Sequence, residues 1–105
     1  MIRVKVEKSQ GSYTSFECTG HAGYAEEGED IVCSAVSALV VTAMNSLEAF
    51  TDEAFSASDR DGHVKAVFHE KNTPEGRLLM DSLLLGLDGI SEEYPKYLKI
   101  QIREV

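Results

Sequence analysis

The sequence is poor in cysteine, in basic residues and in long apolar segments, and each shortage argues against a class of protein. Two cysteines in 105 residues are too few for a disulfide scaffold. Ten lysines and arginines against 18 acidic residues give a net charge of -8, and nucleic-acid binding requires clustered cations. No apolar run reaches the roughly 20 residues that span a bilayer, and no hydrophobic leader follows Met1. We therefore expect a cytoplasmic protein with no membrane partner and no direct nucleic-acid partner.

Alternating apolar residues predict strands along much of the chain. The length suits one domain, 1–105, with a modest core. Turn-rich segments connect the alternating stretches into two hairpins, and a last stretch closes the chain with Leu98, Ile100 and Ile102 facing inward. The first predicted hairpin pairs 2–7 with 13–18 and turns at 9–12. The second pairs 54–58 with 63–69 and turns at 59–62. The closing strand is predicted at 97–105. In the second hairpin Val64, Ala66 and Phe68 are predicted to face the core.

Two helices are predicted, at about 31–50 and about 74–90. The second has Thr73 as its N-cap and Pro74 at its first position, where the missing N–H costs nothing. Its leucines occupy more than one face of the helix. Part of this apolar surface is therefore predicted to remain exposed after the helix packs on the sheet and to form a homodimer interface. Complete burial of that surface within the fold is the alternative. The predicted fold class is an α/β (α+β) sandwich, with a mostly antiparallel sheet of about five strands packed with two helices.

The segment from Gly20 to Leu39 joins His21 to Cys33 across a loop punctuated by Gly23 and Gly28. It is typical of a cysteine nucleophile and its general base. With Asp30 as N-cap, Cys33 falls at about the third helical position, where free N–H groups and the helix dipole stabilise a thiolate.

Other residues of the segment are candidates for supporting roles. Ser37 follows Cys33 by one helical turn and can orient a substrate carbonyl or the imidazole, and Ser34 is a further candidate. The glycines give the loop the freedom to move as a gate over a bound peptide. The acidic residues near Cys33 oppose thiolate formation, and they serve either as a solvated surface or as an attraction for a basic substrate.

The same segment resembles the signature of the ribosomal-processing cysteine protease family, Prp. The resemblance is strongest over Gly20 to Leu39 and maps the family's catalytic histidine and cysteine onto His21 and Cys33. Gly20, Asp30 and Ser37 match as motif neighbours. The resemblance implies a cysteine endopeptidase without a cofactor or metal. Its implied substrate is the precursor of the twenty-seventh protein of the large ribosomal subunit, from which it removes an N-terminal extension.

Two other functions remain open at this stage. A thiol redox protein would use Cys33 together with Cys18, although Cys18 lies in phase with Phe16 on the preceding strand and is equally suited to the core. A non-catalytic module would bind a basic ribosomal protein through the acidic loop. His63 and His69 are expected on the solvent face of the second hairpin.

Overall fold

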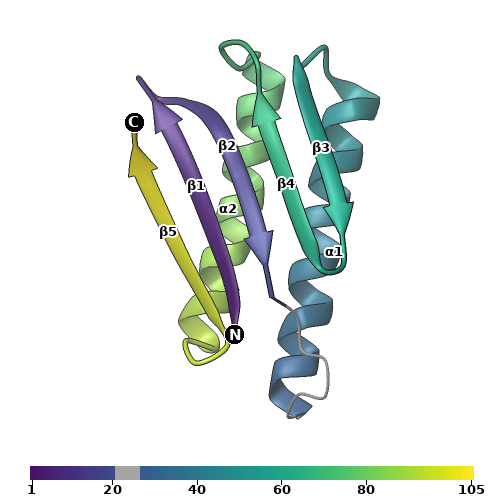
Figure 1. The fold of residues 1–105 in the computed structure, drawn as a ribbon, viewed down its shortest axis with the longest axis vertical. Helices are drawn as coiled ribbons and strands as arrows, with labels where there is room; N and C mark the ends of the chain where they lie inside the picture. Colours follow the sequence, from purple (N-terminus) through teal and green to yellow (C-terminus); the bar gives the residue numbers. More distant parts are fainter. Residues whose placement is uncertain (21–26) are drawn as a thin grey trace.

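Five strands form one sheet, and two helices pack on one of its faces (Figure 1). The computed structural model describes residues 1–20 and 27–105, and the side chains of residues 1–20 and 31–105. The elements in chain order are β1 (Ile2–Ser9), β2 (Ser12–Thr19), α1 (Glu27–Phe50), β3 (Phe55–Arg60), β4 (His63–Phe68), α2 (Pro74–Glu93) and β5 (Leu98–Glu104).

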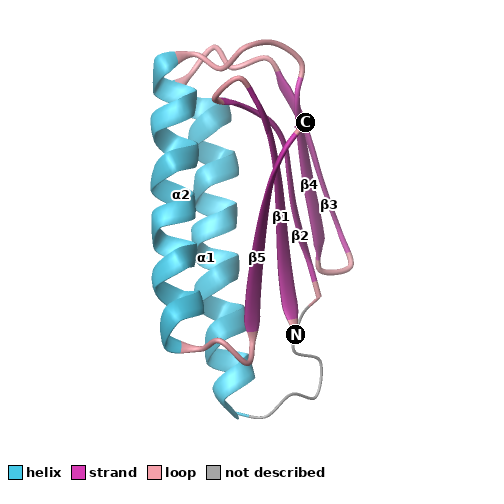
Figure 2. Ribbon diagram, turned by 90° about the vertical axis from the view of Figure 1, so that its left-hand side faces the viewer, coloured by secondary structure: helices cyan, strands magenta, loops and turns pink. Residues whose placement is uncertain are grey.

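The strand order is β3-β4-β2-β1-β5. Three of the four neighbouring pairs are antiparallel, and β1 pairs in parallel with β5 in a register that sets Ile2 opposite Leu98. Figure 2 shows α1 and α2 side by side on the same face, so that the other face of the sheet is free of helices. The predicted α+β fold class is confirmed.

Both hairpins turn through two residues with positive φ. Gln10 and Gly11 have φ of 51° and 78°, and Asp61 and Gly62 have φ of 50° and 76°. Two left-handed residues in succession form the tight turn whose twist matches that of the flanking strands. The second turn is therefore shorter than the four residues predicted for it, and β3 continues to Arg60.

Alternate strand residues point into the core between the sheet and the helices. Ala66 and Phe68 are buried and Val64 is half-buried, as predicted. Ile102 lies on the inner side of the sheet as predicted, in register with the buried Val6, but its side chain is 52% exposed. Figure 1 shows the reason: α2 crosses the sheet diagonally and lies behind the start of β5 but away from its end.

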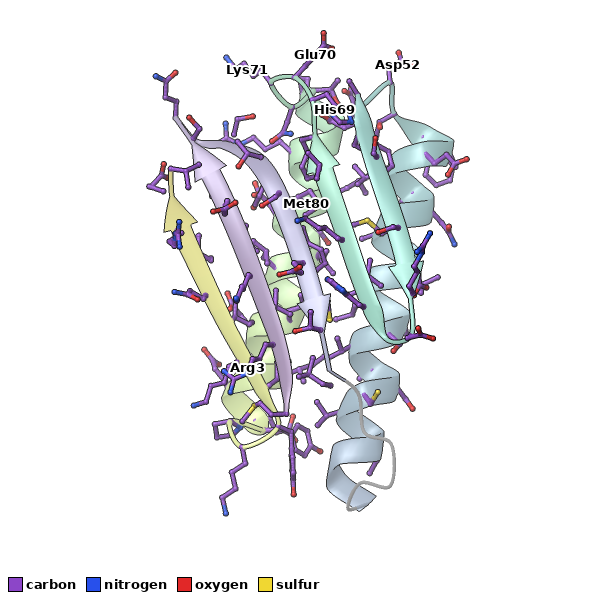
Figure 3. All side chains as sticks on the ribbon, viewed as in Figure 1. Arg3, Asp52, His69, Glu70, Lys71 and Met80 are labelled. Atoms are coloured by element: carbon purple, nitrogen blue, oxygen red, sulfur yellow. The ribbon has the colours of Figure 1, made fainter. Side chains whose placement is uncertain are left out.

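Helix α2 begins with the cap that the sequence predicts. The Thr73 hydroxyl accepts a hydrogen bond from the Gly76 N–H at 3.0 Å, and Pro74 is the first residue of the helix. The Glu53 carboxylate accepts hydrogen bonds from the Thr73 N–H at 3.1 Å and from the Thr73 hydroxyl at 3.0 Å. Glu53 thus ties the loop that follows α1 to the start of α2, at the end of the molecule where Figure 3 labels Asp52.

The segment Ile31–Phe50 of α1 is long and apolar enough to cross a membrane, contrary to our expectation from the sequence. It has 20 residues and a mean hydropathy of 1.6 over its most apolar window. The same length and composition are typical of the core helix of a soluble protein. Val32, Val36, Val40 and Leu47 of this helix are buried against the sheet and α2.

Candidate active site

Cys33 lines a pocket between α1 and the end of the sheet where β2 finishes. The pocket has a volume of about 90 Å³, and Ser37, one turn after Cys33, lines it too. Gly20 and Ile2 border it from the sheet. The predicted placement of Cys33 and Ser37 on one helical face is confirmed, and Cys33 itself is partly exposed.

Cys18 reaches the same pocket from β2. Its side chain is buried, and both cysteines are free thiols. Burial, and secondarily the neighbouring Cys33, raise the pKa of Cys18 to about 11. Because the thiolate is the nucleophilic form, Cys18 is an inert core thiol at neutral pH. Of the two cysteines, Cys33 is therefore the one suited to attack a substrate.

The position of Cys33 within its helix differs from the prediction. Helix α1 begins at Glu27, so Asp30 is the fourth helical residue and not the N-cap, and Cys33 is the seventh. Acidic residue types are favoured in a first helical turn, which explains why the helix extends back to Glu27. The helix dipole acts mainly within the first turn. The prediction that first-turn N–H groups stabilise the Cys33 thiolate is therefore wrong.

Gly20 fixes the point at which the chain leaves β2 toward Cys33. Its φ is +86°, a conformation that other residues adopt only with strain. A Cβ atom at this position would overlap the Met1 carbonyl oxygen. The start of β1 and the end of β2 therefore approach each other at a place that only glycine fits.

The remaining predicted site residues are only partly described. His21 and Gly23 lie outside the described residues. Gly28 and Asp30 are in the first turn of α1, and their side chains lie outside the described set as well. Ser34 is exposed and is not among the residues that line the pocket.

The second hairpin supplies a pocket wall that sequence reasoning missed. Asp59, Gly62 and Val64 line the pocket opposite α1. The available signal was the Asp61-Gly62 turn, which brings β3 and β4 to the same end of the sheet as Gly20. Asp59 adds a carboxylate to a pocket that is otherwise lined mainly by apolar side chains.

His63 and His69 are exposed, as expected from the sequence. His63 Nε2 lies 2.8 Å from Glu17 Oε2, and His69 Nε2 lies 2.7 Å from Ser56 Oγ. Within the described ranges 1–20 and 27–105, no three His, Cys, Asp or Glu side chains lie so as to hold a metal ion.

Known proteins of the same length and fold resemble this chain. The family model "Cysteine protease Prp" matches residues 1–99. The ribosomal processing cysteine protease Prp of Bacillus subtilis is 31% identical over 107 residues, a match that covers 95% of this chain and 96% of that protein. The Staphylococcus aureus protein of the same name is 29% identical, with coverage of 98% and 100%.

Solved structures agree with the sequence relatives. The S. aureus Prp structure in complex with a substrate peptide superposes with a TM-score of 0.90 at 28% identity, covering 97% of this chain and 99% of that one. The S. aureus Prp structure with a covalently linked product peptide gives a TM-score of 0.87 at 30% identity, with the same coverage. A Streptococcus mutans structure gives a TM-score of 0.84 at 32% identity, covering 100% of this chain and 96% of that one. The chain thus belongs to the Prp family of ribosomal processing cysteine proteases.

Proposed function

We propose that this protease removes the N-terminal extension of a large-subunit ribosomal protein precursor, the twenty-seventh protein, with Cys33 as nucleophile and His21 as general base. The observation that carries the proposal is the contrast between the two cysteines. Cys33 is partly exposed on the pocket, whereas Cys18 is buried and protonated at neutral pH. The names of the sequence relatives support the substrate class.

The proposed reaction has two steps. His21 takes the thiol proton of Cys33, and the thiolate attacks the scissile carbonyl to form a thioester while the protonated imidazole delivers its proton to the leaving amine. Water, activated by the same imidazole, then hydrolyses the thioester and regenerates the thiol. Because Cys33 lies beyond the first turn of α1, activation of the thiol depends on His21 more than on the helix dipole.

The pocket favours an extended peptide with a small side chain beside the scissile bond. Its volume of about 90 Å³ is below the roughly 150 Å³ of a cavity that binds benzene. Val36, Val40, Val41 and Val64 provide apolar walls, and Ser37 is placed to orient the substrate carbonyl. The net charge of -8 favours association with a basic ribosomal protein. We also propose that the enzyme acts in the cytoplasm, where such a precursor is made.

The test is incubation of the purified protein with the precursor ribosomal protein, with the products read by intact mass. We expect a single N-terminal truncation by the parent protein and by Cys18→Ala, and none by Cys33→Ala or His21→Ala. Circular dichroism of each variant controls for folding. Cleavage by Cys33→Ala would exclude Cys33 as the nucleophile.

Two other results of the same experiment identify the alternative functions. Tight binding of an uncut precursor under reducing conditions indicates a ribosomal-protein-binding module. Reversible oxidation that joins Cys18 to Cys33, without any cleavage, indicates a thiol redox protein. The high pKa of Cys18 disfavours the redox alternative because it keeps the partner thiol protonated.

We also propose that the chain forms a homodimer through α2. Leu78 and Leu85 are 68% and 75% exposed, and they lie two helical turns apart on one face of the helix. The expected mass in light scattering is that of two chains, and Leu78→Gln with Leu85→Gln is expected to halve it. Ile102→Gln, which changes an exposed apolar residue on β5, is the control. A single monomeric mass for the parent protein across micromolar concentrations would exclude the dimer.

A further inference from the structure

The face of the sheet turned away from the helices concentrates the positive charge of an acidic protein. Strand alternation places six of the ten lysines and arginines on this outer face. Of the acidic residues whose side chains the structure describes, only Glu7 and Glu17 lie there. The six cations are Arg3, Lys5, Arg60, Lys65, Lys99 and Arg103. Figure 3 looks onto this face, and the label of Arg3 marks its position on β1.

The outer face contains a pair of like charges that no carboxylate relieves. Arg3 and Lys99 are direct register partners on β1 and β5, and the other neighbour of Arg3 is Thr19. Adjacent strands are about 4.8 Å apart, and like charges directly opposite each other destabilise a sheet. Both side chains are exposed, and within the part of the chain that the structure describes neither has an ion-pair partner. An anion bound between them would relieve this repulsion.

The two carboxylates of the outer face are already engaged. Glu17 Oε2 lies 2.8 Å from His63 Nε2, and Glu7 Oε2 lies 3.6 Å from an Arg103 Nη atom. A hollow of about 230 Å³ lies among Lys5, Lys65, Arg103 and these two glutamates. Lys5 and Lys65 flank Glu17 on either side in the register. Six cations and two carboxylates give the face a net positive charge.

The distribution of the remaining charge leaves this face available to a polyanion. The other acidic residues whose side chains the structure describes lie on the helices, on the loops and at strand positions that point toward the helices. The molecule measures 18 Å along its shortest axis, the direction in which Figure 1 views the sheet in front of the helices. The Debye length is about 8 Å at physiological salt, so charges on the helical face are screened from an anion on the sheet.

We propose that the outer sheet face docks the phosphate backbone of double-stranded RNA. Of the two large exposed apolar residues within the five strands, Val67 and Ile102, only Val67 lies on this face. Protein interfaces are anchored by apolar and aromatic side chains, which this face lacks, whereas phosphate contacts require only cations. Without an aromatic platform for bases, a duplex suits the face better than a single strand. The choice of RNA over DNA rests on the proposed ribosomal substrate.

The arrangement revises an expectation drawn from composition. A net charge of -8 argues against nucleic-acid binding only if the cations are scattered. Here the period of two residues in the strands collects them on one surface. Because the pocket containing Cys33 lies on the helical side of the sheet, RNA on the outer face would leave the pocket open.

The test is fluorescence anisotropy of a labelled 20-base-pair RNA duplex titrated with the intact protein at 50 to 200 mM salt. We expect Arg3→Gln with Lys99→Gln to weaken binding roughly tenfold at the lowest salt and to reduce the slope of log K against log salt by about two. The matched control is Lys71→Gln with Lys96→Gln, two exposed cations away from the sheet, which should leave binding unchanged. The single variant Lys5→Gln should reduce the slope by about one.

Three results would overturn the proposal. The first is that the parent protein does not bind duplex RNA at 50 mM salt. The second is that the outer-face and control variants lose RNA affinity equally. The third is that polyglutamate binds as tightly as RNA, which would indicate an acidic protein as partner. Cleavage of a free precursor peptide is measured on the same samples. Its retention in Arg3→Gln with Lys99→Gln shows that the variant is folded, and it separates failure of RNA docking from failure of the proposed protease function.

Discussion

Cys18 on β2 and Cys33 on α1 line the same pocket but differ in exposure, because Cys18 is buried and Cys33 is partly exposed. Only Cys33 is therefore expected to react with iodoacetamide at pH 7.5, adding one carbamidomethyl group by intact mass. Cys33→Ala should remain unmodified in the native state and should take up one group in denaturant, where Cys18 becomes accessible. Two groups on the native parent protein would contradict the assignment of Cys18 to the core.

The glycine that ends β2 should be intolerant of any side chain. Gly20→Ala forces a Cβ atom against the Met1 carbonyl oxygen and costs roughly 1–2 kcal/mol through positive φ alone. We expect lower stability in urea unfolding and loss of precursor cleavage, because the turn leads directly into His21. The matched control is Gly89→Ala in α2, where a Cβ atom would meet nothing within 4 Å. That control should gain about 1 kcal/mol. Full activity of Gly20→Ala would show that the turn does not position His21.

The link between α1 and α2 at Glu53 should affect stability without affecting catalysis. Glu53→Ala removes the acceptor for both the N–H and the hydroxyl of Thr73, as well as for Asn72 Nδ2 at 3.3 Å. The expected loss is about 1–3 kcal/mol in urea unfolding. Precursor cleavage at low temperature should be unchanged, since Glu53 lies at the opposite end of the sheet from Gly20. Glu48→Ala, at an exposed position of α1, is the control and should change neither quantity.

Stability should fall on the alkaline side because two core groups resist ionisation. Burial raises the pKa of Cys18 from 9.0 to about 11, and burial with a hydrogen bond to the Asp81 carboxylate raises the pKa of Tyr13. When a group has a higher pKa in the folded state than in the unfolded state, its contribution to stability is complete at pH values below the unfolded-state pKa. That contribution is lost as the pH rises through the folded-state pKa. For Cys18 this window runs from about pH 9 to pH 11.

The measurement is the free energy of unfolding in urea at pH 7 and at pH 10.5. For Cys18→Ala we expect the difference between the two pH values to be smaller than in the parent protein by about 2 kcal/mol. Cys33→Ala should change the difference much less, because burial and not the neighbouring thiol is the larger cause of the Cys18 shift. An unchanged difference in Cys18→Ala would contradict the raised pKa.

The sequence predicted the order and type of all seven elements because periodicity is a local property. Thr73 and Pro74 located the start of α2 for the same reason. The start of α1 was misplaced because Asp30 is equally suited to an N-cap and to a first helical turn, and only the preceding backbone decides between them. The exposure of Ile102 was not predictable, because it depends on the diagonal path of α2 across the sheet, which no local pattern encodes.

Only the parts of the candidate site that are close together in the sequence could be predicted. The spacing of Cys33 and Ser37 follows from the helical period. The pocket wall from Asp59 and Val64 depends on β4 pairing with β2, a contact between segments about 46 residues apart in the sequence. The concentration of cations on the outer face was likewise hidden, since it requires the register of strands from the beginning, middle and end of the chain.

The parallel pairing of β1 with β5 also determines when the sheet around β1 can form. Ile2 cannot meet Leu98 until ribosomal synthesis has passed the last strand, so a nascent chain lacks one neighbour of β1. Contacts at such sequence separation slow folding, because the long intervening loop must close first. The backbone of Met1, which lies close to Gly20, therefore takes its final position late in folding. The pocket that Ile2 and Gly20 border therefore reaches its final form only after β5 has joined the sheet.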